Sequence, residues 1–125
     1  QQVKIPARNF NLPYREYLTL LKASSVVLIM FKIKEGWCIT AHEAMLLKTP
    51  VIGTDLGALK ELFEEGKQVI CNDFKNLKER VEYLLNHPGV RRKMGENGHS
   101  YAKQFTLERF QNAWSDLIKT ITQKY

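Results

Sequence analysis

Two glutamates separated by seven residues, Glu35 and Glu43, are the side chains in this sequence whose type and spacing most suggest chemistry. Glu35 precedes Gly36 at the expected end of a strand, and Glu43 lies inside an expected helix. A helix amino terminus offers free backbone N–H groups and a partial positive charge, which suit a phosphate or diphosphate. Neighbouring carboxylates would accept hydrogen bonds from hydroxyl groups instead, Glu35 from a sugar and Glu43 from a ribose. From spacing alone, the alternative of two solvated glutamates at helix ends stays open.

The flanking segments predict a strand, a glycine turn, a helix and a second strand. Residues 26–31 are apolar throughout, which favours a strand buried on both faces of a parallel sheet. Residues 39–47 suit a helix, and the run from Lys48 to Pro50 ends it, because proline restricts the residue before it to extended geometry. Val51 and Ile52 begin the next strand. In open α/β sheets, the turn between such a strand and helix is where nucleotides bind.

The rest of the chain extends the same alternation. We expect short strands at 3–5 and 68–71, and helices following Pro13 and Ala58, the first broken by Ser24-Ser25 and the second ended by Gly66. Three helices then follow. One carries the apolar stripe Leu77, Val81, Leu84 and Leu85, one begins at Pro88 and is interrupted at Gly95 or Gly98, and the last is an amphipathic helix over 106–124.

The last helix begins at Thr106 as its cap and presents an apolar face that we expect to belong to the core. Its members are Leu107, Phe110, Trp114, Leu117, Ile118 and Ile121. The predicted fold class is α/β: a parallel sheet with flanking helices and a helical C-terminal tail.

Composition limits the protein class. The 125 residues suffice for one domain with a real core, and 44% hydrophobic with 26% charged residues is ordinary for a globular domain. Cys38 and Cys71 are the only cysteines, which suits a reducing compartment and argues against a disulfide scaffold or zinc site. The net charge of +6 is spread along the chain and accompanies no nucleic-acid motif. Because the first residue is Gln1 and not Met, we expect a piece of a longer protein.

The joined pattern resembles the signature of the retaining glycosyltransferases of family four, which have two Rossmann-like domains, the GT-B architecture. Their donor domain carries a pattern like E-G-F-G-x-x-x-x-E-A-M-A-x-G-x-P-V-I, and residues 35–52 here follow it. The loop Thr54-Asp-Leu-Gly57, with Glu61 beyond it, resembles the family's next loop, G-G-x-x-E. Upstream and downstream segments are also similar, so the resemblance covers nearly the whole chain.

The resemblance implies a donor-binding domain, residues 1–125, that lacks the front of the complete domain. Glu35 would contact the donor sugar as the catalytic residue, and Glu43 would bind the ribose of a nucleotide diphosphate sugar. Backbone groups at Gly36, Trp37, Cys38 and Ile39 would meet the diphosphate. The family transfers a hexose or similar sugar with retention at the anomeric carbon, needs no metal or other cofactor, and neutralises the diphosphate with a Lys and an Arg earlier in the domain.

The implied partners are the nucleotide sugar, an acceptor that is a glycan, lipid or small molecule, and the N-terminal domain of the parent chain. The resemblance implies no nucleic acid, and a cytoplasmic location with possible peripheral membrane contact. The chain alone would be inactive, since the chemistry lies between two domains.

Five positions depart from the family pattern and keep alternatives open. Phe31-Lys32 stands in place of Pro-Ser, and Cys38, Lys48 and Ala58 stand where the family has glycines. Lys48 would have to adopt a left-handed backbone, at a cost of about 1 kcal/mol. Of these, Lys32, Cys38 and Lys48 support a non-catalytic α/β interaction module as the alternative. A third reading, a basic nucleic-acid or membrane-surface domain, depends on net charge only.

Overall fold

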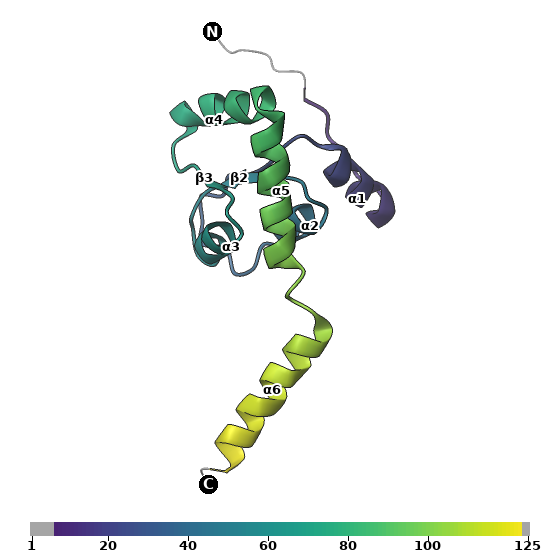
Figure 1. Ribbon diagram of the computed structural model, residues 1–125, viewed down its shortest axis with the longest axis vertical. Coiled ribbons are helices and arrows are strands. Elements are labelled where there is room, and N and C mark those ends of the chain that lie inside the picture. The colour runs from purple at the N-terminus through teal and green to yellow at the C-terminus, as the bar shows by residue number, and fades with distance from the viewer. Residues whose placement is uncertain (1–6, 124–125) are drawn as a thin grey trace.

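A parallel three-stranded sheet with six helices forms the structure, a computed structural model that describes residues 7–123 (Figure 1). The strand expected at 3–5 and the last residue of the helix expected to end at 124 lie outside the described residues. The elements are α1 (Tyr14–Ala23), β1 (Val27–Ile29), α2 (Ile39–Leu46), β2 (Val51–Gly53), α3 (Leu59–Glu65), β3 (Val69–Ile70), α4 (Phe74–Asn86), α5 (Pro88–Ala102) and α6 (Leu107–Thr122). The predicted α/β class is confirmed, and so is the order of its elements within the described residues.

The strands lie in the order β1-β2-β3, all parallel, with Val27 opposite Val51 and Ile52 opposite Val69. Successive side chains of a strand point to opposite faces, and on β2 both faces are covered. Val51 packs with α2, α3 and the end of α5, while Ile52 packs with α4 and the middle of α5. Both side chains are fully buried, so β2 is the centre of the core.

The first strand differs from its prediction. Ile29 is buried against the α2 and α3 side, but Leu28, on the other face, is 47% exposed. β1 is therefore an edge strand within the described residues, with only one face covered. The apolar run predicts the strand correctly but not its burial, because burial depends on what lies beside and above it.

α5 continues through both glycines that were expected to interrupt it. Each glycine lies where the helix meets α2. A Cβ on Gly95 would collide with the carbonyl oxygen of Lys48, and one on Gly98 would lie 3.2 Å from Cγ of Met45. These glycines allow a close approach between helices, and the prediction of a break is wrong. In Figure 1 α5 runs from α4 across the sheet to α2 and α3.

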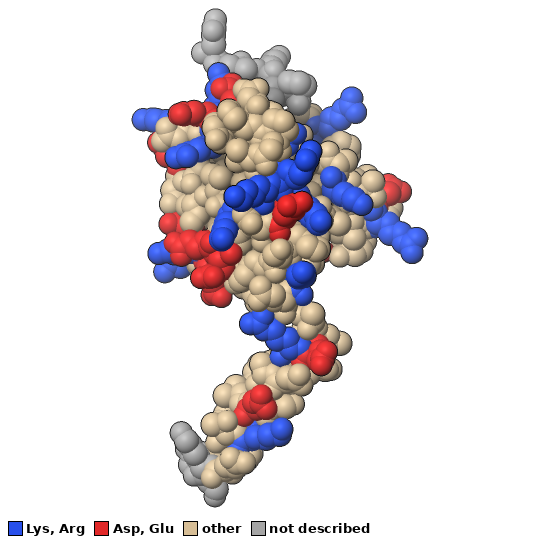
Figure 2. Space-filling model, in the orientation of Figure 1, with Lys and Arg blue, Asp and Glu red and all other residues tan. Residues whose placement is uncertain are grey.

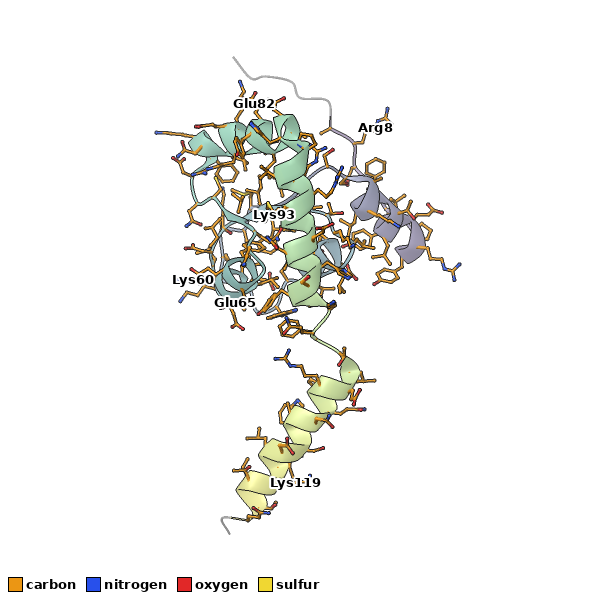
Figure 3. All side chains as sticks on the ribbon, viewed as in Figure 1. Arg8, Lys60, Glu65, Glu82, Lys93 and Lys119 are labelled. Carbon is orange, nitrogen blue, oxygen red and sulfur yellow. The ribbon has the colours of Figure 1, made fainter. Side chains whose placement is uncertain are left out.

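α6 leaves the body of the molecule, and none of its residues is buried (Figure 1). Its cap is confirmed, because the Thr106 side chain accepts a hydrogen bond from the backbone N–H of Arg109. Its apolar face, however, is not part of the core: Trp114 is 52% exposed and Phe110 60%. Figure 3 shows the side chains of α6, Lys119 among them, extending with no other element beside the helix. Leu85 on α4, also expected in an apolar stripe, is likewise exposed.

Within residues 7–123, no helix is both long enough and apolar enough to cross a membrane.

Candidate functional site

The predicted site residues lie where the chain leaves β1 and enters α2. This loop is attached to the loop that follows β2: Glu35 forms a parallel bridge with Gly57, and the Ala58 N–H donates to the Glu35 carbonyl oxygen at 3.1 Å. Both loops follow the carboxyl ends of parallel strands, the edge where open α/β sheets bind ligands. The backbone of Glu35 is thus fixed by a neighbouring loop, and its side chain is half-buried.

Gly57 is the residue that permits this contact between the loops. Its φ is +68°, and a Cβ there would collide with the carbonyl oxygen of Glu35. Only glycine adopts this backbone freely and leaves room for the oxygen. Gly57 is also the loop glycine of the sequence pattern. Its positive φ and its contact with Glu35 explain why a glycine is needed at this position.

The start of α2 combines an open glycine with a buried cap. Gly36 is exposed, and a Cβ on it would meet nothing within 4 Å. Cys38 is the N-cap residue, yet its side chain is buried in the core and makes no capping hydrogen bond. The cysteine in place of a glycine therefore points inward, whereas Trp37 before it and Ile39 after it are exposed, Ile39 to 67%.

Cys38 lies at the start of α2, between the two glutamates along the chain. Burial raises the pKa of the Cys38 thiol, an effect opposed by the N–H groups of Ala41 and Thr40. The charges of Glu35 and Glu43 raise this pKa further. Glu35 precedes the helix start, and Glu43 lies just over one turn inside the helix.

Glu43 has two partners that sequence reasoning missed. The Tyr14 hydroxyl donates to its Oε1 at 2.6 Å, and the Tyr17 hydroxyl donates to its Oε2 at 2.9 Å. Both tyrosines come from α1, and their rings stack at 6.1 Å. The hydrogen bond from Tyr14 to Glu43 raises the pKa of Tyr14, and burial raises that of Tyr17. Their spacing of three residues places both on one helix face, but nothing local to α1 indicates Glu43 as the partner.

Trp37 is part of an aromatic cluster at the turn before α2. Its ring lies 5.7 Å from that of His42 and 5.0 Å from that of Phe105, and Phe105 in turn contacts Tyr101. Burial lowers the pKa of His42, outweighing the opposite effects of the Ala102 backbone and of Glu43. His42 is accordingly a packed, neutral ring at pH 7. This aromatic cluster holds the loop before α2 against the end of α5.

Comparison with known proteins identifies the family of this chain. The sequence profile described as "Glycosyl transferases group 1" matches residues 9–101, which span α1 to the end of α5 and include both loops of the site. The chain belongs to the glycosyl transferases group 1 family. It has the Rossmann-like α/β fold of a GT-B glycosyltransferase domain.

Individual relatives agree with this assignment. The chain is 32% identical over 108 residues to a protein named trehalose synthase from Thermococcus litoralis, covering 85% of this chain and 26% of the relative. It is 31% identical over 121 residues to a trehalose synthase from Pyrococcus horikoshii, covering 95% of this chain and 29% of that protein. An uncharacterized glycosyltransferase of Methanocaldococcus jannaschii is 35% identical over 78 residues, 60% of this chain and 22% of the relative. The chain therefore spans between a fifth and a third of these three relatives.

One departure from the glycosyltransferase pattern has a visible consequence. Lys48 occupies a glycine position, and its φ is +61°, as the sequence predicts. The turn still closes, because the Thr49 N–H donates to the Ala44 carbonyl at 2.8 Å. α2 therefore ends at Leu46, followed by a lysine in a left-handed conformation.

Proposed function

We propose that this chain is the donor-binding part of a retaining, family-four-type glycosyltransferase that uses a nucleotide diphosphate sugar and acts within a longer protein. The observation that supports this most is the fixed turn before α2. There the backbone of Glu35 is held by Gly57, Gly36 is open, and the start of α2 follows directly, with Glu43 just over one turn inside the helix. Family membership gives the transferase activity, and the turn suggests how the donor binds.

Glu35 would orient the donor sugar and stabilise charge in the transition state. The backbone from Gly36 to Ile39 would bind the diphosphate, with the positive end of α2 favouring its negative charge. Glu43 would accept from the ribose hydroxyls. A carboxylate has about four acceptor sites, so Glu43 keeps capacity for a ribose beside the two tyrosine hydroxyls.

The remaining parts of the reaction are expected from elsewhere in the parent protein. Within the part of the chain that the structure describes, no three His, Cys, Asp or Glu side chains come together as a metal site. The absence of a metal requirement stays a prediction. The Lys and Arg that neutralise the diphosphate, the acceptor site and the N-terminal domain would all belong to the longer protein.

The proposal is tested by turnover in that longer protein. Glu35→Gln keeps the size of the side chain but removes its charge. We expect it to lower kcat by about 100-fold or more, the usual effect of removing a transition-state contact. Glu79→Gln, an exposed position on α4, is the matched control. Nuclear magnetic resonance of the product would show retention. Inversion at the anomeric carbon, or equal rates for the two variants, would contradict the proposal.

The alternative, a non-catalytic module, is favoured by one observation: both oxygens of Glu43 already have partners within the chain. Under this alternative the carboxylate ties α1 to α2 and binds no ribose. A parent protein that binds no nucleotide sugar but keeps the α1–α2 contact would support it.

A further inference from the structure

A second polar hollow lies at the opposite edge of the sheet from the glutamate site. It has a volume of about 280 Å³ and is bordered by the residues that precede β1 and β2, including Ser25 and Pro50. The strands are parallel, so this edge holds their amino ends, whereas Glu35 and Gly57 follow their carboxyl ends. The hollow is thus separate from the proposed donor site.

Four cations line this hollow, and no acidic residue does. Lys22 comes from the last turn of α1, Lys48 from the turn after α2, and Arg91 and Arg92 from the first turn of α5. The ion pairs among the described residues involve other lysines on α3, α4 and α6. The first turn of α5 adds the positive end of its dipole. Figure 2 shows Lys and Arg side chains gathered along the upper part of α5 on the viewed face, whereas Asp and Glu gather near α3.

Specific contacts hold these three elements together. The Thr49 hydroxyl donates to the Leu21 carbonyl oxygen at 2.9 Å, which joins the turn of Lys48 to the end of α1. Gly95 packs directly on the Lys48 carbonyl, which brings α5 against the same turn. Arg91 donates from Nη1 to the carbonyls of Leu84 and Leu85 at 3.0 and 3.1 Å, which joins the start of α5 to the end of α4. The cations are therefore gathered by packing, although they repel one another.

Lys48 makes this arrangement notable. Lys48 has a left-handed backbone, φ +61°, which is unfavourable for a lysine and favourable for a glycine. Strained residues of this kind persist where their surroundings hold them, and often where a ligand binds. Here the strained residue supplies one of the four charges.

We propose that this hollow binds a phosphate or diphosphate group, on a phosphorylated small molecule or on an anionic lipid headgroup. Arginine provides paired N–H donors for phosphate oxygens, and lysine provides a compact charge. The site goes beyond the donor site and does not depend on it, since it uses other residues at the other end of the strands.

The test uses two lysines in the same backbone conformation. Lys67 also has a positive φ, +52°, but does not line the hollow. Lys48→Gly and Lys67→Gly each remove one charge from a left-handed position that glycine tolerates, so both keep the fold. Pyrophosphate is titrated into each variant and into the unchanged chain, with amide chemical shifts as the readout.

We expect saturable shifts at the amides of residues 24–25, 48–49 and 89–92. Binding should weaken about fivefold in Lys48→Gly, the equivalent of one partly exposed charge contact, and less than about twofold in Lys67→Gly. Flotation with vesicles of phosphatidic acid and of phosphatidylcholine distinguishes the source. Selective flotation with phosphatidic acid, lost in Lys48→Gly, indicates a headgroup; pyrophosphate binding without flotation indicates a free phosphorylated ligand. No saturable shift at millimolar pyrophosphate together with no selective flotation, or equal weakening in both variants, would overturn the proposal.

Discussion

Among single residues, Glu43 has two proposed roles: it accepts hydrogen bonds from the tyrosines of α1, and it is the expected ligand of a ribose. Its carboxylate accepts from Tyr14 and Tyr17, and it also stands where the family's ribose ligand is expected. The sequence predicts the position of Glu43 on the helix from the spacing to Glu35. It does not predict the tyrosines, because 29 and 26 residues separate them from Glu43 and only the packing of α1 on α2 joins them.

Removing the Tyr17 hydroxyl tests whether this contact stabilises the chain. Tyr17 is part-buried and donates to both Glu43 and Thr40, so we expect Tyr17→Phe to lower the free energy of unfolding by about 1 kcal/mol. Urea unfolding provides the measurement. Tyr83→Phe removes a hydroxyl from an exposed ring and should change stability much less. Equal effects of the two substitutions would show that the Glu43 contact contributes nothing.

His42 gives the fold a pH dependence of known sign. Burial holds its folded pKa below the ordinary 6.5, so the unfolded chain binds a proton more readily than the folded one. The stabilisation is complete above pH 6.5 and is lost as the pH falls through the folded pKa. We expect the free energy of unfolding to fall between about pH 7 and 5. In His42→Phe this slope should be smaller; an unchanged slope would assign it to other groups.

At the level of helices and strands, sequence patterns predict the element bounds correctly where local preference and tertiary packing agree. The apolar run of β1, Gly36 and Pro50 place β1, α2 and β2 within a residue or two of their observed bounds. They failed at α5, where glycines normally weaken a helix but here allow α2 to approach. The sequence of one helix does not show which other element packs against it.

Substitutions at two glycines of α5 distinguish the two effects of a glycine, weakening of the helix and close approach to a neighbour. Gly95→Ala places a methyl group against the Lys48 carbonyl, and we expect it to lower the free energy of unfolding by about 1–3 kcal/mol. Gly89→Ala, at an open position of the same helix, should leave stability unchanged or raise it by up to about 1 kcal/mol. Chemical denaturation of both variants is the measurement. A Gly95→Ala protein as stable as Gly89→Ala would contradict the close approach of the helices.

α6 should contribute little to the stability of this chain, in spite of its strong apolar face. Trp114→Ala removes a half-exposed ring and should change the free energy of unfolding by less than about 0.5 kcal/mol. Phe63→Ala removes a fully buried ring from the core and should cost about 3–5 kcal/mol. If Phe63→Ala does not fold, Phe63→Leu provides the core comparison. A large loss in Trp114→Ala would mean that α6 packs on the body.

In the whole molecule, the loops that follow β1 and β2 are attached to each other, whereas β1 and α6 each have a face that no other described element covers. Within the described residues β1 is an edge strand whose Leu28 side chain is exposed, and α6 has an uncovered apolar face. The chain also spans under a third of the three relatives compared with it. The sequence predicts the fold class and the turn before α2 because both are encoded locally. Edges and uncovered faces depend on neighbours in space, and their exposure could be known only from the structure.

The central claim is that a nucleotide diphosphate sugar binds at the start of α2 with Glu43 on its ribose. Calorimetric titration of several such sugars into the longer protein, carrying Glu43→Ala or the exposed control Glu79→Ala, tests it most directly. We expect at least one sugar to bind. Glu43→Ala should weaken its binding about 10- to 100-fold, as expected for losing hydrogen bonds to a charged group, and Glu79→Ala should leave its affinity unchanged. Equal affinity in the two variants, or binding of none of the sugars, would contradict a ribose contact by Glu43.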